Sequence, residues 1–399
     1  MENNLEKVYD TIIIRFSGEL WLKKLWTRKY YEKRLAKNLK QTLKHYNISY
    51  SRLNRKHGRF YLKTKSTIRA TSQLAKVFGI SSISPAVETT SEIDDIIKYG
   101  LKLAEIALKN GNSFAVRCKR VGKHNFSSSY IQKQLGKKVL DHFDQKLDLR
   151  VDLGKPDIIL GVEIRDNQAF IFLETFEAVG GMPLGVQPRL VGLFSGGIDS
   201  VIGLWLVMKR GCPVIPVYFD NSPFTDITTT ERAIRVAEKL FKWSIGFPKK
   251  IYIVQHGENL KQIMETDRKY SCLLCKRMMY RVAERIADKL HAEGIVTGEA
   301  IGEQASQTLT NLRVLNMVVK NYPVHRPLLG FDKQETEKLS RKIGTFEASS
   351  KKAAPCTAVP YQPSTKAKLE AIRKAEEKLD IEVMIKRTLE SIKIVEIEK

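Results

Sequence analysis

Residues Leu193-Phe194-Ser195-Gly196-Gly197-Ile198-Asp199-Ser200 carry the clearest structural signal in the second half of this 399-residue chain. They lie between an apolar run predicted to be a strand (190–194) and an apolar run predicted to be a helix (201–209). Two adjacent glycines let the backbone approach a phosphate group closely, and the following helix points free N–H groups at the anion. We therefore expect a phosphate-binding turn. It is not a Walker A loop, because no Gly-Lys-Ser/Thr is present.

The polar side chains of this turn suit the same chemistry. The hydroxyls of Ser195 and Ser200 can donate hydrogen bonds to phosphate oxygens. The carboxylate of Asp199 can hold Mg²⁺ or a ligand amine. The alternative is a glycine-rich turn with no chemical role.

Around this turn, strand and helix patterns alternate, which is typical of a doubly wound parallel sheet. Ligands in such folds bind at the carboxyl ends of the strands, where Tyr218 and Phe219 end the strand after the turn. The expected elements are 190–194, 201–209, 214–219, 229–241, 250–255, 276–290 and 294–297.

The first half reads as two smaller α+β modules. Strands are predicted at 11–15, 58–63 and 113–120, amphipathic helices at 20–43 and 93–108, a serine-capped helix at 127–147, and an antiparallel pair at 156–164 and 167–173. We place a Gly/Pro linker at 179–188. The expected domains are 1–70, 71–178, 189–365 and a helical C-terminal extension at 366–399.

Charge is concentrated in the first module. The chain has a formal net charge of +24, and residues 1–70 contain 18 Lys and Arg against 5 Asp and Glu. Such a block attracts polyanions, because phosphates neutralised by cations release counterions. A nucleic-acid partner is favoured, and a merely solubilising surface is the alternative.

Other features restrict the class of protein. No apolar run approaches the roughly 20 residues that span a bilayer, and Met1 to Asp10 lack a secretory signal. We expect a cytoplasmic protein without membrane contact. Five cysteines make no disulfide framework, and Cys118 and Cys212, which have apolar neighbours, are predicted to be inert.

The turn resembles the PP-loop of ATP pyrophosphatases, enzymes that adenylate an oxygen, release pyrophosphate and let a nucleophile displace AMP. Three later stretches narrow the resemblance to the tRNA 4-thiouridine synthetase (tRNA sulfurtransferase) family: 270–279, 297–308 and 322–328. The stretch 15–23 is similar to that family's ferredoxin-like domain, and 114–120 with 162–165 to its THUMP RNA-binding domain. The fold class implied is α/β, with ferredoxin-like and THUMP modules before a PP-loop domain.

The resemblance implies contacts with ATP. Leu193, Phe194, Tyr218 and Phe219 would flank the adenosine, Gly298 and Gln307 would contact the nucleotide, and Lys276 would approach the phosphates. Without the resemblance, Tyr218 and Phe219 could be strand-end packing and Lys276 a solvated residue at a helix start.

Three cysteines have a different setting: Cys272 and Cys275 form a C-x-x-C, and Cys356 follows Pro355. The three could ligate a [4Fe–4S] cluster that leaves one iron open to sulfide, as in relatives that lack a rhodanese domain. Alternatively, Cys356 accepts a persulfide and Cys272 or Cys275 resolves a disulfide. Structural Zn²⁺ or idle thiols are the third interpretation. In both the cluster and the persulfide interpretations, we expect Lys276 and Arg277 to lower the pKa of the thiols.

The function implied by the resemblance is adenylation of uracil O4 at uridine 8 of tRNA and its replacement by sulfur. The catalytic residues would be Asp199, Cys356, Cys272 and Cys275. The chain ends at Lys399, so we expect no rhodanese relay within it. Sulfide or a persulfide-carrying protein would then be the sulfur donor. The family resemblance also implies a homodimer. The alternatives are a PP-loop synthetase or amidotransferase acting on a small molecule, and a non-catalytic tRNA-binding protein.

Overall fold

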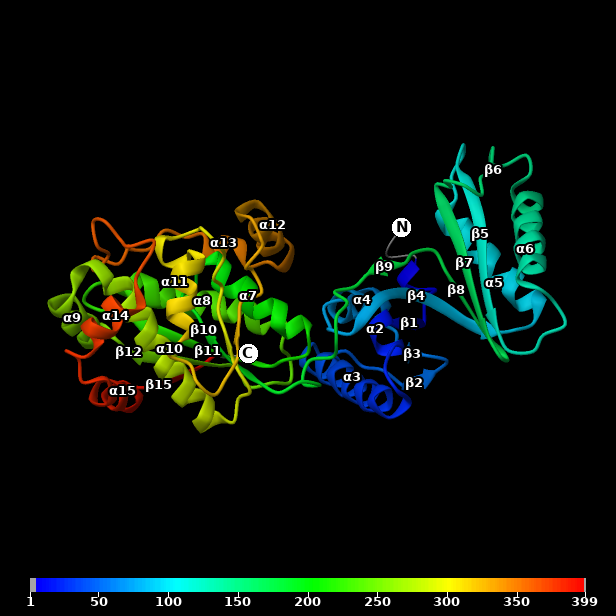
Figure 1. The fold of residues 1–399 in the computed structure, drawn as a ribbon. Coiled ribbons are helices and arrows are strands. Elements are labelled where there is room, and N and C mark those ends of the chain that lie inside the picture. Colours follow the sequence, from blue (N-terminus) through cyan, green and yellow to red (C-terminus); the bar gives the residue numbers. More distant parts are fainter. Residues whose placement is uncertain (1–4, 398–399) are drawn as a thin grey trace. The chain divides into compact units, whose positions relative to one another are not determined.

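A computed structural model describes residues 5–397, which form two compact units that divide between Pro183 and Leu184 (Figure 1). Residues 1–4 and 398–399, assigned above to the first and last expected domains, lie outside the described residues. Within 5–397, no helix combines the length and apolar character needed to cross a bilayer.

The first unit is built on one continuous run of paired strands, in the order β2-β3-β1-β4-β8-β7-β5-β6, with β9 on β4. Its elements are β1 (Thr11–Phe16), α2 (Gly18–Trp21), α3 (Leu25–His45), β2 (Arg52–Lys56), β3 (Arg59–Lys63), α4 (Thr67–Leu74), β4 (Ile80–Thr90), α5 (Ile93–Ala107), β5 (Ser113–Val121), α6 (Ser128–Phe143), β6 (Arg150–Val151), β7 (Ile158–Arg165), β8 (Gln168–Phe172) and β9 (Phe176–Glu177). The predicted serine cap of α6 is confirmed, because the side chain of Ser127 accepts a hydrogen bond from the backbone N–H of Tyr130.

Strand β4 joins the two modules of this unit. Residues 80–86 of β4 pair with β1, whereas residues 87–90 pair with β8. The expected boundary between 70 and 71 is wrong, because it falls inside α4 and leaves half of β4 in the wrong module. The strand was missed because Pro85 interrupts its pattern, and a proline argues against a central strand.

Helix α3 carries the expected leucine stripe and a basic outer face. Leu35, Leu39 and Leu43 are fully buried, while the lysines at 33, 37 and 40 are exposed. The helix begins at Leu25 and not at 20, because a separate short turn of helix, α2, precedes it. Trp26 near its start is 79% exposed.

The second unit is the predicted doubly wound domain, with strand order β14-β13-β10-β11-β12-β15. Helices α7 and α8 pack together with α12 and α13, and α10 packs on β10 with α9, α11 and α15 as neighbours. Its elements are β10 (Leu190–Leu193), α7 (Ile198–Lys209), β11 (Val214–Asp220), α8 (Ile227–Phe241), β12 (Lys250–Gln255), α9 (Gly257–Thr266), η1 (Arg268–Tyr270), α10 (Ser271–Leu290), β13 (Ile295–Val296), η2 (Ala305–Gln307), α11 (Leu309–Asn316), β14 (Val324–His325), α12 (Lys333–Ile343), α13 (Phe346–Ser349), α14 (Leu369–Glu376), α15 (Ile381–Glu390) and β15 (Lys393–Glu396).

The C-terminal segment is part of this domain and not a helical extension of it. Strand β15 pairs antiparallel with β12, and the side chains of Ile372, Met384 and Ile385 are buried in the same core as β10 and α10. The expectation failed because a four-residue strand with charged neighbours has too short a pattern to recognise.

Candidate active site

The predicted phosphate turn connects β10 to α7 in the form expected of an anion site. Gly196 has a φ of +71°, and a Cβ atom there would lie 2.6 Å from the Cα atom of Ala233. Only glycine fits this position. The Ser200 hydroxyl donates to the carbonyl of Gly197 (2.9 Å), while the backbone N–H of Gly197 donates to the Ser195 hydroxyl (3.2 Å). These bonds hold the turn open in front of the helix N-terminus.

A cavity of about 500 Å³ opens at this turn. It contains most of the residues predicted to bind nucleotide: Leu193, Phe194, Ser195, Gly197, Asp199, Ser200, Tyr218, Phe219, Lys276, Gly298 and Gln307. Cys356 also lines it. Gly196, Cys272 and Cys275 are not among the lining residues. Residues from five distant stretches of sequence therefore meet at one hollow.

Asp199 is paired with a cation that the sequence did not indicate. The ammonium group of Lys333 lies 2.8 and 2.9 Å from the two carboxylate oxygens of Asp199 and 3.4 Å from that of Glu303. Burial by itself would lower the pKa of Lys333, but hydrogen bonding to Asp199 and the two nearby carboxylates raise it above its usual value. The ammonium group therefore stays charged.

Lys276 is held by a buried carboxylate. Glu299 accepts from Lys276 (3.3 Å), from the hydroxyl of Tyr280 (2.5 Å) and from Arg326 (2.9 Å). Burial by itself would raise the pKa of Glu299, but the charge of Lys276, the hydrogen bond from Tyr280 and the charge of Arg326 bring it below its usual value. Glu299 is thus ionised and fixes Lys276 at the cavity wall.

The aromatic pair at the end of β11 is partly committed to other contacts. Tyr218 donates to the hydroxyl of Thr229 (2.8 Å), and the ring of Phe219 packs edge-on against His256 with centroids 5.4 Å apart. Both residues nevertheless line the cavity. Tyr218 and Phe219 can therefore pack at the end of the strand and still present a surface to an adenine ring in the cavity.

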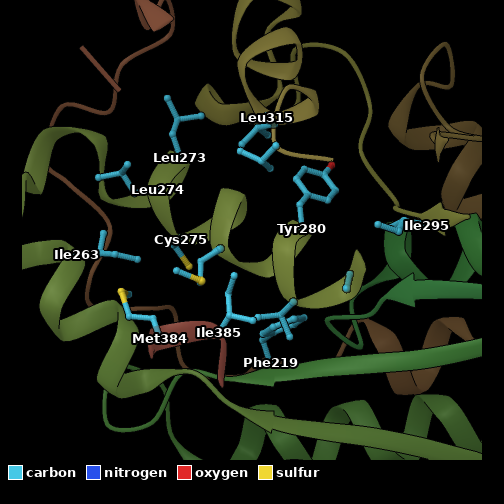
Figure 2. Packing of buried hydrophobic residues seen from close by; sticks show 14 of the residues in the cluster. Phe219, Ile263, Leu273, Leu274, Cys275, Tyr280, Ile295, Leu315, Met384 and Ile385 are labelled. Carbon is cyan, nitrogen blue, oxygen red and sulfur yellow. The ribbon is translucent and has the colours of Figure 1, made fainter. Parts of the chain in front are cut away.

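The three cysteines differ in their surroundings. Cys356 is half-buried at the cavity, whereas Cys275 is buried among Phe219, Met384 and other hydrophobic side chains (Figure 2), with its sulfur 3.4 Å from Nε2 of His256. Burial lowers the pKa of His256 to about 4, so its imidazole is neutral. Cys272, in the first turn of α10, is half-buried.

The expected lowering of the thiol pKa is wrong. Burial raises the pKa of all three thiols, and although Lys276 lowers that of Cys272, burial and the charge of Cys356 outweigh it. Arg277 points elsewhere, because its guanidinium donates to Glu376. In the part of the chain that is described, no three His, Cys, Asp or Glu side chains are arranged to hold a metal ion. The thiols as placed therefore do not form the metal site predicted from Cys272, Cys275 and Cys356.

Comparisons with known proteins agree with this architecture. A family model described as thiamine biosynthesis protein (ThiI) matches residues 185–381, a THUMP domain model matches 90–174, and a ThiI ferredoxin-like domain model matches 11–84. The sheet, the turn and the N-terminal modules thus define a PP-loop ATP pyrophosphatase domain joined to a THUMP module.

Whole-chain relatives specify the family. The chain is 41% identical to a probable tRNA sulfurtransferase of Methanosarcina mazei, over 98% of this chain and 96% of the relative, and 35% identical to one of Thermococcus kodakarensis, over 92% and 96%. A crystal structure of a 4-thiouridine synthetase–RNA complex with bound ATP is 32% identical, with a TM-score of 0.87 over 98% of this chain and all of that one. This chain belongs to the tRNA sulfurtransferase family, as the sequence motifs predicted.

Proposed function

We propose that this chain is an ATP-dependent tRNA sulfurtransferase that adenylates O4 of uridine 8 and replaces it with sulfur, giving 4-thiouridine. One observation carries the proposal: the Ser-Gly-Gly-x-Asp-Ser turn and Cys356 line the same cavity. An activating group and a sulfur group can therefore act on one base.

ATP would bind with its phosphates at the turn, where the lining residues Ser195, Gly197, Ser200 and Lys276 would supply donors and positive charge. Gly196 would shape the backbone of this turn. Leu193, Phe194, Tyr218, Phe219, Gly298 and Gln307 would contact the adenosine. Support comes from the cavity lining and from the bound ATP in the related 4-thiouridine synthetase structure.

Uracil O4 is a poor leaving group, and transfer of AMP to it converts it into a good one. O4 would attack the α-phosphorus of ATP, the bond between the α-phosphorus and pyrophosphate would break, and the N3 proton would pass to a water molecule as N3 becomes doubly bonded to C4. Lys276, which lines the cavity, and Lys333, which pairs with Asp199, would offset the charge of the departing pyrophosphate. Sulfur would then attack C4 and expel AMP. The target base must be turned out of the tRNA, at a cost of a few kcal/mol.

Mg²⁺ fits the donor set at Asp199 and Glu303, the two carboxylates that now share Lys333. Mg²⁺ is commonly held by one or two carboxylates together with substrate phosphates, and it would neutralise phosphate charge. Since residues 5–397 contain no preformed group of three metal ligands, we propose that the ion enters with ATP.

Sulfur would be delivered through the cysteines. In the persulfide route, the outer sulfur on Cys356 attacks C4; the Cys272 thiolate then attacks the Cys356 sulfur, which frees the thiolated base and leaves a disulfide for a cellular dithiol to reduce. Three thiolates also suit a [4Fe–4S] cluster, although residues 5–397 contain no preformed group of three metal ligands. Iron and sulfide assays on anaerobically purified protein separate the two routes.

The partner would be tRNA, and the basic first unit would contact its backbone. Support comes from the relatives, which are described as probable tRNA sulfurtransferases, and from the related 4-thiouridine synthetase structure, which holds RNA. The homodimer expected from the family is a separate proposal, which analytical ultracentrifugation checks. The central experiment measures pyrophosphate release with and without tRNA, followed by mass analysis of tRNA nucleosides. A small-molecule synthetase would turn over ATP without tRNA, and a non-catalytic RNA-binding protein would not turn it over at all.

A further inference from the structure

Four buried polar atoms in the cavity have no hydrogen-bond partner among the described residues. They are Oδ1 of Asn221, Oγ1 of Thr225, Nε of Arg232 and Oε1 of Gln307. An unpartnered buried polar atom is destabilising, so a set of such atoms facing one cavity suits contact with a bound ligand. Gln307 already has a predicted ligand, the nucleotide. The other three lie in one segment, 221–232, that the sequence did not single out.

This segment is bonded to the one that carries Cys356. The backbone N–H of Thr357 donates a hydrogen bond to the carbonyl of Phe224 (2.9 Å). Phe224 lies between Asn221 and Thr225, in a turn that is closed by a hydrogen bond from its own N–H to the carbonyl of Asn221 (2.8 Å). Ala353, Ala354 and Pro355 line the cavity beside Cys356. Asn221 and Thr225 therefore belong to the wall from which sulfur is delivered.

Arg232 has a different position. Its neighbour Ala233 packs against Gly196 of the phosphate turn, and its guanidinium donates to the carbonyl of Lys351 (3.3 Å). A guanidinium cannot accept a hydrogen bond, so it suits a phosphate and not the N–H group of a base.

The chemistry of the reaction defines what this wall must contact. O4 of the uracil must face the α-phosphorus, which leaves N3–H as a donor and O2 as an acceptor for the protein. Asn221 Oδ1 is an acceptor without a donor, and the hydroxyl of Thr225 can donate.

We infer that Asn221 and Thr225 form the recognition site for the target uracil, with Oδ1 of Asn221 accepting from N3–H and the hydroxyl of Thr225 donating to O2. This inference rests on the proposed function. It deepens it by naming the residues that select a uracil.

The test uses the full chain with tRNA transcripts that carry either uridine or 2-thiouridine at position 8. Sulfur at position 2 is a weaker acceptor and leaves O4 unchanged. The variants are Asn221→Ala, Thr225→Val and Thr225→Ser, and Thr228→Val is the control because Thr228 is exposed on the same segment outside the cavity. Readouts are ATP binding, tRNA binding, and kcat/KM for tRNA-dependent AMP formation.

We expect Asn221→Ala and Thr225→Val to lower kcat/KM about 10- to 100-fold with ATP and tRNA binding retained, and Thr225→Ser and Thr228→Val to stay close to wild type. The 2-thio substitution should slow the wild type and Asn221→Ala but not Thr225→Val. Three outcomes would overturn this inference while leaving the proposed function standing. The first is an unchanged kcat/KM in Asn221→Ala and Thr225→Val, and the second is loss of ATP binding in these variants. The third is a 2-thiouridine substrate that slows Thr225→Val as much as it slows the wild type. Wild-type protein that forms no AMP with any tRNA overturns the proposed function as well.

Discussion

The ammonium nitrogen of Lys333 lies 2.8 and 2.9 Å from the two carboxylate oxygens of Asp199, although 134 positions separate them in sequence. Asp199 is in the first turn of α7, and Lys333 is the first residue of α12. A capping box between Asp332 and Glu335 fixes where α12 begins and therefore where Lys333 stands. The pair brings a cation to the mouth of the phosphate turn.

Asp199→Ala should abolish pyrophosphate release while tRNA still binds, because it removes the carboxylate assigned to Mg²⁺. Lys333→Gln should slow release about 10²- to 10³-fold, the usual effect of removing one group that stabilises developing charge. A pyrophosphate assay with saturating tRNA measures both. Lys338→Gln, exposed on the same helix, is the control. Normal turnover in Asp199→Ala would remove Asp199 from the mechanism.

Cys356→Ala should stop 4-thiouridine formation and leave tRNA-dependent AMP formation detectable, because the proposed function assigns Cys356 to the sulfur-transfer step, which follows adenylation. Nucleoside mass analysis and an AMP assay on the same samples measure the two steps separately. Cys212→Ala is the matched control, since Cys212 lies outside the cavity lining. Full thiolation by Cys356→Ala would contradict both the persulfide and the cluster routes.

Glu299→Gln should destabilise the second unit by about 3 kcal/mol at pH 7, because it leaves the largely covered guanidinium of Arg326 without its charged partner. The pKa of Glu299 is below its usual value in the folded protein, so the stabilisation is present above about pH 4.3 and is lost as pH falls through the folded pKa. The difference from wild type in urea unfolding should therefore shrink in acid. Glu370→Gln, exposed on α14, should show no such pH-dependent difference.

The affinity for tRNA should fall steeply with salt if the basic face of α3 contacts phosphates. Replacing Lys33, Lys37 and Lys40 by Gln should weaken binding and reduce the slope of log K against log salt by roughly one for each phosphate contact removed. Replacement of the same residues by Arg keeps the charge and should keep the slope. Filter binding over a range of salt concentrations checks this, and identical slopes in the Gln and wild-type proteins would exclude this face.

Much of the architecture could be predicted from sequence because its signals are local. The phosphate turn needs a glycine at 196 for backbone reasons, the strands of the parallel sheet are short apolar runs, and α3 shows its leucine spacing directly. Two of the elements that were missed or assigned wrongly, β4 and β15, are stabilised by pairing with β1, β8 and β12. Pairing of distant strands leaves little trace in their own residues.

The local sequence was enough to predict a glycine turn between a strand and a helix, with backbone N–H groups available to a phosphate, and a basic first module that favours a nucleic-acid partner. Which distant groups meet that turn became visible in the folded structure alone. It brought Lys333 to Asp199, Glu299 to Lys276 and Cys356 to the same cavity, and it buried Cys275 in the core. The physical reason is that backbone conformation depends on neighbouring residues, whereas charge pairing and burial depend on packing between segments far apart in the chain.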